Sequence, residues 1–542
     1  MGSATSRLSM VRSFEPGVAD GIWFQLVEAG SVRDGRPITW PIPNFLQAPD
    51  AAEVQAAEGY RAEPGFAPVA IPIDWGANPF RDRAWMNRLM CLQPMDAYVL
   101  AFRAGERRWL RPAADIYFSW CDYHLQQRQR AYMSWYDMPV GYRATKTAFL
   151  LSAVLEGDLE PSVDEQRVLV ASAEAHLREL VRPDTLSHGN HGIFQMHGLA
   201  VLAQCFWALP DARPALDYAR ETMQYLVGRQ FNDEGVHLEH SPKYHEWMMG
   251  ELSDIAASGW HALDVAAVLE RAEEVRGWFL EPDGGVVRIG DTASFRGWPP
   301  ATVSTPDFAN DRYQMRWFRK GGYAVARSAD GQLFVQGSYH SRAHKHADDL
   351  SFELFDRGRR ILVDSGAEGY GVGSARAYFL STAAHNTVEV DAMSHPRDGT
   401  DAYGSSIQDV ETRPDEVRVR AAVDHVSMDW RHERVLSWKP GQRLVLYDRL
   451  TSPRFRSFSF WLHLAPEFER LDDATFCDGE VHCVLECEAP YRWYRGTEDP
   501  MRGWRANGTD ERLPAWSGCA TVTAAQVYLR TIVRVSASCD CG

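Results

Sequence analysis

A histidine-rich run at residues 344–349 carries the residue types best suited to chemistry in this chain. His344 and His346 lie two positions apart on a segment with extended character, and alternation along a strand points two such imidazoles to the same side. A β-turn-β unit after them would bring Asp364 back beside them, and His385 begins another strand-like run. Two imidazoles and a carboxylate can hold a divalent metal, most often zinc. The run therefore predicts a catalytic and metal-binding corner of an enzyme; the alternative is a hydrogen-bonded polar cluster without metal.

Two further polar clusters lie earlier in the chain, at residues 187–195 and 239–245. In the first, Asn190 and His191 place a neutral amide beside a titratable base, although a capped helix with a satisfied histidine would look the same. In the second, Tyr244 has lysine and histidine neighbours and could act as a base or an acid. The alternative for Tyr244 is a simple packing residue.

The charge of the chain constrains its partners. A net charge of -16 argues against a protein coated in basic surface for nucleic acid, because such proteins displace counterions with clustered lysine and arginine. A local positive surface around the histidine-rich run would still steer an anionic ligand, unless these side chains form an ordinary solvated face. The basic residues near the run are Arg342, Lys345, Arg359, Arg360, Arg376 and Arg397.

The elements that must position these clusters show two different patterns of apolar residues. From about residue 85 to 280, apolar residues recur every three or four positions between prolines, which predicts an all-α domain. After about residue 315, short alternating runs rich in valine, phenylalanine, tyrosine and leucine predict a β-sandwich. Residues 356–358, Asp-Arg-Gly, have the chemistry of a tight hairpin within it. A linker is expected at residues 296–300, because 542 residues exceed one ordinary core.

The cysteines and the hydropathy of the chain argue against several other classes of protein. The nine cysteines form no CxxC pair and no repeated spacing, which argues against a zinc ribbon or a disulfide framework. No run approaches the roughly 20 apolar residues of a membrane span. The N-terminus lacks the apolar run of a secretory signal, so the compartment stays open: bacterial periplasmic or secreted if a signal was removed, otherwise cytoplasmic. The oligomeric state is also open.

Several of these segments match one known family. Residues 344–354, 363–366 and 384–388 closely resemble the C-terminal signature of heparinase II/III-like polysaccharide lyases. Residues 190–192 and 241–244 are similar to the catalytic segments of that family's helical domain, and the motifs occur in family order between about 135 and 465. The resemblance implies an α+β multidomain protein. Its N-terminal part, residues 1–310, would be an incomplete (α/α) toroid, and residues 311–542 would be an antiparallel β-sandwich.

The same resemblance implies a reaction. An anionic polysaccharide would be cleaved by β-elimination at a uronic acid, with loss of the proton at C5 and departure of the glycosidic oxygen at C4. Asn190, helped by His344, would stabilise the charge that develops on the carboxylate. Tyr244 would take the proton or protonate the leaving oxygen, and His191 would be the base for a proton on the opposite face.

The family pattern also assigns supporting residues. His346, Asp364 and His385 match its metal ligands, and the metal, expected to be zinc, would organise the site without activating water. Arg143 and Gln195 would contact the substrate, together with Arg342 and Lys345 from the basic surface.

The sequence leaves alternatives for the substrate and for the class of protein. Heparin or heparan sulfate is the first candidate, with alginate or a bacterial exopolysaccharide as the alternative for the same chemistry. A metal-dependent glycan hydrolase, in which the metal would activate water, is a different class. A non-catalytic sugar-binding protein is a third, although three polar clusters argue against it.

Overall fold

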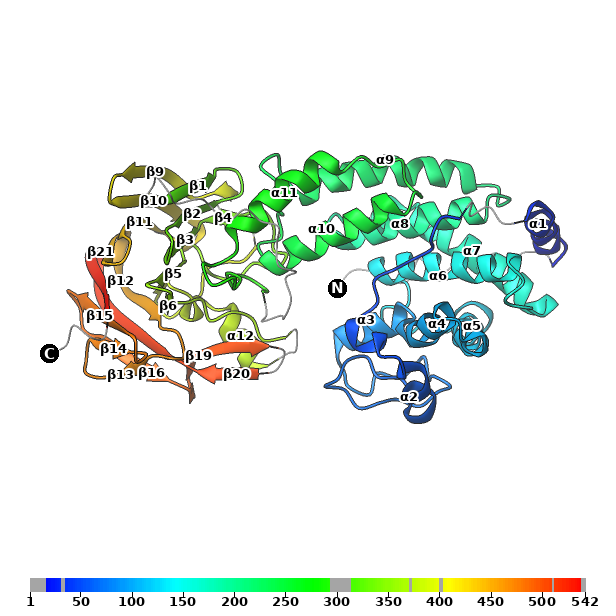
Figure 1. The fold of residues 1–542 in the computed structure, drawn as a ribbon, viewed down its shortest axis with the longest axis horizontal. Helices are drawn as coiled ribbons and strands as arrows, with labels where there is room; N and C mark the ends of the chain where they lie inside the picture. Colours follow the sequence, from blue (N-terminus) through cyan, green and yellow to red (C-terminus); the bar gives the residue numbers. More distant parts are fainter. Residues whose placement is uncertain are drawn as a thin grey trace. The chain divides into compact units, whose positions relative to one another are not determined.

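The computed structural model of this protein describes six stretches of the chain, and these form two compact units. The first unit comprises Met1–Arg229 and Glu251–Val265, and the second comprises Gln230–Gly250 and Ala266–Gly542 (Figure 1). The predicted linker at residues 296–300 lies outside the described residues. The described stretches are 16–30, 35–292, 313–369, 373–398, 403–508 and 511–537.

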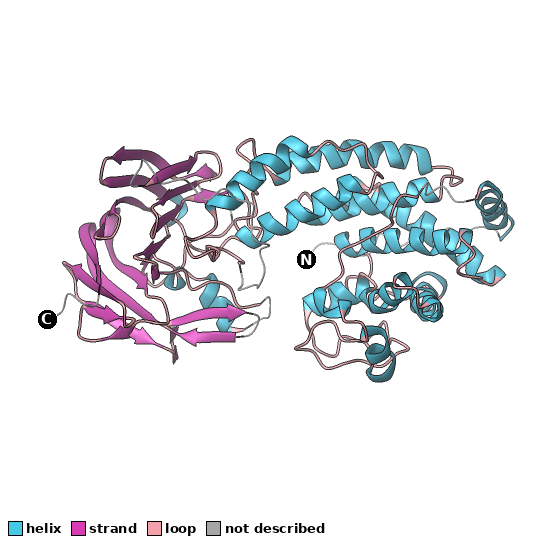
Figure 2. Ribbon diagram, viewed as in Figure 1, coloured by secondary structure: helices cyan, strands magenta, loops and turns pink. Residues whose placement is uncertain are grey.

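The first unit is built from helices, as the spacing of apolar residues predicts (Figure 2). A capping box starts one of them: the Ser162 hydroxyl accepts a hydrogen bond from the Glu165 amide, and the Glu165 carboxylate accepts one from the Ser162 amide. No helix in the described part of the chain is long and apolar enough to cross a membrane. The helices are α1 (Pro16–Ala29), α2 (Ala51–Glu58), α3 (Arg83–Met90), α4 (Asp96–Arg103), α5 (Leu110–Cys121), α6 (Asp137–Leu155), α7 (Val163–Leu180), α8 (Asn190–Cys205) and α9 (Ala212–Gln230).

Helices α6 and α8 approach each other at glycines. A Cβ atom on Gly198 would lie 2.1 Å from the carbonyl oxygen of Gly141, and one on Gly141 would lie 2.4 Å from the carbonyl oxygen of Phe194. Larger residues at these positions would push the helices apart. This contact fixes α8, which is buried along almost its whole length, against α6.

In its described residues, the second unit contains two large antiparallel sheets, three two-stranded sheets and a few helices. It holds the first half of α10 (Pro242–Ala257), together with α11 (Ala266–Trp278) and α12 (Ser374–Leu380). The smaller sheet has the order β1-β2-β3-β5-β6. Its strands are β1 (Gln314–Phe318), β2 (Tyr323–Arg327), β3 (Gln332–Gln336), β5 (Phe352–Asp356) and β6 (Arg359–Leu362).

The larger sheet has ten strands, in the order β13-β14-β15-β21-β12-β11-β10-β9, with β7 paired to β12 and β16 paired to β21. Short pairs join β4 (Ser338–Tyr339) to β8 (Gly404–Ser405), β17 (Thr497–Glu498) to β18 (Met501–Arg502), and β19 (Trp504–Gly508) to β20 (Glu511–Pro514). The ten strands are β7 (Val388–Val390), β9 (Ile407–Arg413), β10 (Glu416–His425), β11 (Trp430–Lys439), β12 (Arg443–His463), β13 (Glu469–Arg470), β14 (Thr475–Cys477), β15 (Val481–Cys487), β16 (Tyr491–Arg495) and β21 (Trp516–Ala537).

The two sheets share one hydrophobic core. Val335 and Leu354 of the smaller sheet are buried in the same cluster as Leu436 and Val533 of the larger one. Two sheets that bury their inner faces against each other form a β-sandwich. A helical region followed by an antiparallel β-sandwich is therefore confirmed.

The turn between β5 and β6 is the tight hairpin that the sequence predicts. Arg357 and Gly358 both have positive φ, 52° and 75°, which is the backbone of a type I′ turn. The preceding segment differs from expectation, because residues 343–351 form a loop and not a strand. His344 in that loop has a φ of 55°, in the left-handed region. Strand alternation therefore does not orient His344 and His346.

Candidate active site

Tyr244 and His344 form the centre of the polar site in the second unit. Pro242 begins α10, a position where its missing amide proton costs no hydrogen bond, and Tyr244 follows in the first turn. The phenol ring stacks on the imidazole of His344, with ring centroids 3.5 Å apart and an interplanar angle of 19°. The two predicted catalytic residues of this unit therefore lie in direct contact.

Two carboxylates hold the imidazole of His344. Its Nδ1 lies 2.9 Å from Oδ2 of Asp291, and its Nε2 lies 3.4 Å from Oε2 of Glu239. Burial opposes the charged form, but the hydrogen bonds to Asp291 and Glu239 outweigh it and raise the pKa of His344. A protonated His344 would present a positive charge beside the phenol of Tyr244.

Asp291 joins several groups of the site. Its Oδ1 lies 3.0 Å from Nε2 of His346 and 2.6 Å from Nη1 of Arg376. Burial alone would raise the pKa of Asp291, yet hydrogen bonds from His344, His346 and Arg376 hold it well below the usual range. Asp291 therefore remains ionised and orients both histidines.

Sequence reasoning missed Asp291 and Glu239 as members of this site. Glu239 lay within one of the polar clusters but received no role, and Asp291 lies in a segment without a clear pattern. The adjacent Gly290 was the available signal: a Cβ there would lie 2.3 Å from the carbonyl oxygen of His240 and 2.8 Å from that of His344. A glycine at such a close backbone approach indicates that three segments converge.

His240 holds the loop that carries His344. Its Nδ1 lies 2.9 Å from the carbonyl oxygen of Ala343, and its Nε2 accepts a hydrogen bond of 2.9 Å from the amide of His340. This pattern requires one protonated and one unprotonated nitrogen, and burial lowers the pKa of His240 to about 3. His240 is therefore neutral and positions the loop.

Only part of the predicted basic surface lies at this site. Arg376 contacts Asp291, and Arg397 donates to the carbonyl oxygen of Lys345 at 3.3 Å. Burial lowers the pKa of Arg397, and the charges of Arg342 and Arg376 lower it further. Arg397 therefore lies near enough to Arg342 and to Arg376 for their charges to oppose its own, as in a site that receives an anion.

The other three basic side chains are engaged elsewhere. Lys345, predicted to bind substrate, is 3% exposed, and its ammonium pairs with Asp348 and Asp349. Arg359 pairs with acidic residues at 478 and 480, and Arg360 with those at 281 and 283. Burial and pairing favour a structural role for Lys345 over a substrate contact.

In the first unit, the predicted catalytic pair begins α8. Asn190 is the first residue of this helix and is largely buried. His191, one residue on, has its Nδ1 3.0 Å from Oδ1 of Asp137 at the start of α6. With Nδ1–H donated to Asp137, Nε2 keeps the lone pair that a general base needs. Asp137 is the member of this pair that sequence reasoning missed.

Arg143 and Gln195 occupy positions that do not suit a substrate contact. Arg143 is 0% exposed, and its guanidinium donates to His176 and to the carbonyl oxygens of Met90 and Ser134. Gln195 accepts from the Ser187 amide at 2.8 Å and donates to the Thr185 carbonyl at 3.0 Å. These contacts brace the interior of the unit and the loop before α8.

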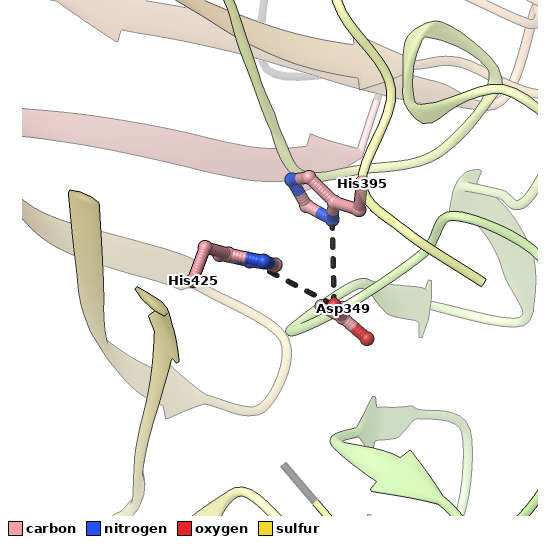
Figure 3. Close-up of side chains that lie close together, drawn as sticks. All are labelled: Asp349, His395 and His425. Carbon is pink, nitrogen blue, oxygen red and sulfur yellow. Dashed lines mark ion pairs between the residues drawn. The ribbon is translucent and has the colours of Figure 1, made fainter. Parts of the chain in front are cut away.

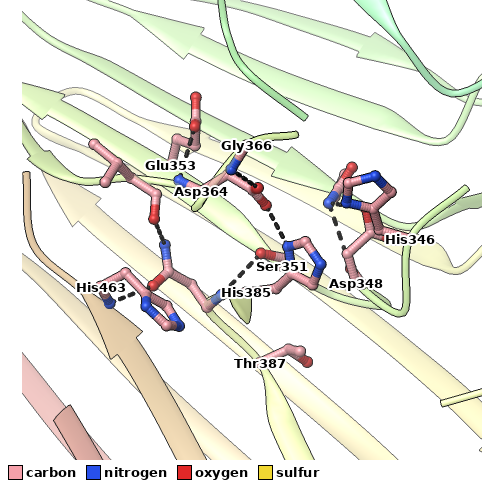
Figure 4. Close-up of polar contacts among 12 residues, drawn as sticks. His346, Asp348, Ser351, Glu353, Asp364, Gly366, His385, Thr387 and His463 are labelled. Atoms are coloured by element: carbon pink, nitrogen blue, oxygen red, sulfur yellow. Dashed lines mark hydrogen bonds and ion pairs between the residues drawn. The ribbon is translucent and has the colours of Figure 1, made fainter. Parts of the chain in front are cut away.

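The predicted metal ligands lie deep in the second unit (Figure 4). Nδ1 of His385 lies 2.7 Å from Oδ2 of Asp364, whose Oδ1 accepts from the Gly366 amide at 2.8 Å. Nδ1 of His346 and Nε2 of His385 are buried and have no hydrogen-bond partner among the described residues. The two rings lie 5.3 Å apart, centroid to centroid. The two buried lone pairs are donors that suit a divalent metal. Asp364, however, faces Nδ1 of His385, the nitrogen opposite the unpartnered Nε2, so among the described side chains the three predicted ligands do not converge on one point.

Comparisons with known proteins identify the fold. The structure is similar to a crystal structure of heparinase III, with 16% sequence identity, a TM-score of 0.74, and coverage of 97% of this chain and 90% of that chain. It is also similar to a mutant heparan sulfate lyase from Pedobacter heparinus, with 14% identity, a TM-score of 0.62, and coverage of 96% and 89%. These likenesses confirm a fold with a helical N-terminal region and an antiparallel β-sheet domain after it, as in heparinase III. No curated protein matches the sequence.

Two family models identify the chain more closely. The model for the heparinase II/III N-terminus matches residues 51–273, and the heparinase II/III-like C-terminal model matches residues 310–509. The chain belongs to the heparinase II/III-like family, as the resemblance of its motifs indicated. It is a polysaccharide lyase.

Proposed function

We propose that this lyase cleaves a glycosaminoglycan of the heparin or heparan sulfate type by β-elimination and leaves an unsaturated uronate at the new chain end. The observation that carries the proposal is the stacked pair of Tyr244 and His344, with His344 held between Asp291 and Glu239. An acid–base side chain beside a stabilised positive charge is what this elimination requires.

The chemical step uses Tyr244 for proton transfer. Its deprotonated oxygen takes the proton at C5 of the uronate, the electron pair forms the C4–C5 double bond, and the bond from C4 to the glycosidic oxygen breaks. The resulting phenol then returns the proton to the departing oxygen, which restores the phenolate. Atoms and charge therefore balance with Tyr244 alone when the proton and the leaving group lie on one face.

The uronate carboxylate must be neutralised while the C5 proton leaves. Protonated His344 suits this role, because Asp291 and Glu239 favour its charged form. We assign the amide of Asn190 to the same carboxylate. His191, oriented by Asp137, would be the base when the C5 proton lies on the opposite face.

The arginines support a sulfated substrate. Arg376 contacts Asp291, the partner of His344, and the charges of Arg342 and Arg376 oppose that of Arg397. A ligand rich in anions would relieve this repulsion at Arg397. One structure with this fold is named for its action on heparan sulfate, which favours the same class. Alginate or a bacterial exopolysaccharide offers carboxylates without sulfates and is the second candidate.

We also propose a structural divalent metal, zinc by ligand type, bound by His346, Asp364 and His385. The buried, unpartnered nitrogens of the two histidines support it. Bound there, the metal would fix the orientation of His346, which shares Asp291 with His344. Its contribution would be positional, with no part in proton transfer.

The experiment that tests the function is digestion of a panel of polyuronates, followed by the ultraviolet absorbance of the unsaturated product. The panel should contain heparan sulfate, its unsulfated precursor and alginate. We expect absorbance to rise with heparan sulfate. A rise with alginate alone would contradict the substrate class, and saturated products with complete loss of turnover in chelator would indicate the metal-dependent hydrolase instead.

A further inference from the structure

A second cluster of histidine and carboxylate side chains lies apart from the residues assigned above. Asp349, His395 and His425 bring one ligand atom each to within 4.8 Å of one another (Figure 3). The residues come from three segments: the loop before β5, the segment after β7, and the end of β10. None of the three belongs to the predicted metal set.

The carboxylate of Asp349 faces in two directions. Its Oδ1 lies 3.1 Å from the ammonium of Lys345. Its Oδ2 lies 3.7 Å from Nδ1 of His395 and 3.8 Å from Nε2 of His425. Both separations are too long for a hydrogen bond, because a nitrogen and an oxygen about 3.6 Å apart no longer form one. Two ligands of one ion at metal–ligand distances of about 2.0–2.2 Å lie roughly 3.5 Å apart, so these separations suit a shared metal.

The tautomer of His395 points a lone pair at Asp349. Its Nε2 lies 2.7 Å from the carbonyl oxygen of Val388, so the ring proton is on Nε2. Its Nδ1 is buried and has no hydrogen-bond partner among the described residues. A neutral nitrogen facing a carboxylate oxygen in a buried site places two lone pairs against each other, an arrangement that a cation stabilises.

The rings are held in place by packing. The imidazole of His425 stacks on Trp430, with centroids 4.0 Å apart and an interplanar angle of 27°, and it lies 4.6 Å from the ring of His395. His425 and Trp430 are opposite each other at the end of the β10–β11 ladder. The site is therefore built on a strand end and is shaped before any ligand binds.

We propose that Asp349, His395 and His425 bind a second divalent metal ion, and that two imidazole nitrogens with one carboxylate favour zinc. Water would complete the coordination. The ion would link two parts of the unit: the loop that contains His344 and the end of the β10–β11 hairpin. It would stabilise that loop without taking part in the chemistry. The proposal is independent of the substrate.

The most direct test is an anomalous diffraction map at the zinc edge, from crystals of the full chain equilibrated with zinc. We expect a peak bounded by Oδ2 of Asp349, Nδ1 of His395 and Nε2 of His425. Density at that point without an anomalous signal would show a bridging water and overturn the proposal, as would the absence of density.

Zinc stoichiometry gives a second test that does not use activity. After dialysis against zinc, His395→Gln should bind one zinc per chain fewer than the natural protein. His245→Gln is the matched control, because His245 is equally buried and its Nε2 also lies near a backbone carbonyl oxygen, that of Ala272 at 2.8 Å. Equal stoichiometry in His395→Gln and the natural protein would overturn the site. If His395→Gln fails to fold, Asp349→Asn replaces it.

Discussion

The phenol ring of Tyr244 lies flat against the imidazole of His344, with centroids 3.5 Å apart. One residue comes from the first turn of α10 and the other from a loop between β4 and β5. The left-handed backbone at His344 lets the loop present its side chain there, and the contact of His240 with Ala343 holds it. A residue forced into this region stores strain that the surrounding contacts must offset.

Asp291 should set the pH range of activity. Because the folded-state pKa of His344 is raised, its positive charge is present at low pH and is lost as the pH rises through that pKa. Asp291→Asn removes the strongest partner, so we expect the alkaline limb of kcat/KM to move to lower pH. At neutral pH, kcat/KM should fall roughly 10-fold or more.

The control for this variant is Asp283→Asn, which removes a carboxylate that pairs with Arg360 instead. Its pH profile should match that of the natural protein. An unchanged alkaline limb in Asp291→Asn would contradict the assignment of the charge to His344.

The two histidines of the 344–346 segment should have separate roles. His346→Gln should lower zinc content and the temperature of unfolding, because it would remove a ligand of the proposed structural metal. His344→Gln should retain zinc and stability and lose activity, since it removes only the charge beside Tyr244. Metal analysis and thermal unfolding of both variants check this division. Equal zinc loss in the two variants would contradict it.

Arg342 should contribute to binding of sulfated chains. Its side chain is 64% exposed and pairs with Asp398, which is as exposed, so Arg342→Ala should fold normally. For a sulfated substrate we expect KM to rise a few-fold, which corresponds to a loss of about 1 kcal/mol of binding free energy. For an unsulfated substrate KM should change little. Arg359→Ala, which loses an exposed pair with Glu480, is the matched control. Equal changes with both substrates would argue against recognition of sulfate.

The sequence predicted the fold well because periodicity depends on local residues. The helical spacing of apolar residues up to α11 and the alternating runs of the sandwich are properties of short segments. The hairpin at Arg357 and Gly358 follows from the backbone preferences of the turn residues. The same local reasoning failed at His344, where tertiary contacts impose a loop and a positive φ.

The site was predicted only in part, for a related reason. Tyr244 and His344 carry recognisable chemistry, but Asp291, Glu239 and Asp137 are ordinary carboxylates until the fold brings them to a histidine. Burial was equally hidden: Arg143 and Lys345 are charged in sequence and fully enclosed in the structure. Partners and exposure are tertiary properties, and apart from Gly290 beside Asp291 these residues carry no local signal for them.

Asp448 should stabilise the folded state of the second unit, which holds the site. It accepts hydrogen bonds from His432 and from Arg434, whose guanidinium also donates to the carbonyl oxygens of Leu350 and Asn386. Burial opposes ionisation, but Arg434 and His432 lower the pKa of Asp448 to about 2. This stabilisation is present above the ordinary carboxyl pKa and is lost as the pH falls toward 2.

We therefore expect Asp448→Asn to lower the free energy of unfolding at pH 7 by about 2 kcal/mol or more. The difference from the natural protein should begin to narrow below about pH 4, the unfolded-state pKa. Urea unfolding at several pH values measures it. Asp424→Asn, at an exposed pair with Arg431, is the control and should cost less than about 1 kcal/mol. A pH-independent difference for Asp448→Asn would contradict the linkage.

The most direct test of the central claim is the rate at which Tyr244→Phe forms unsaturated uronate from a defined heparan sulfate chain, followed by absorbance and product mass. We predict that the natural protein gives the unsaturated product and that Tyr244→Phe gives it about 10²- to 10⁴-fold more slowly, with zinc content and unfolding temperature unchanged. Tyr339→Phe, in the same unit and near His240, should retain full activity. A natural rate in Tyr244→Phe, or a saturated product from the natural protein, would contradict β-elimination through Tyr244.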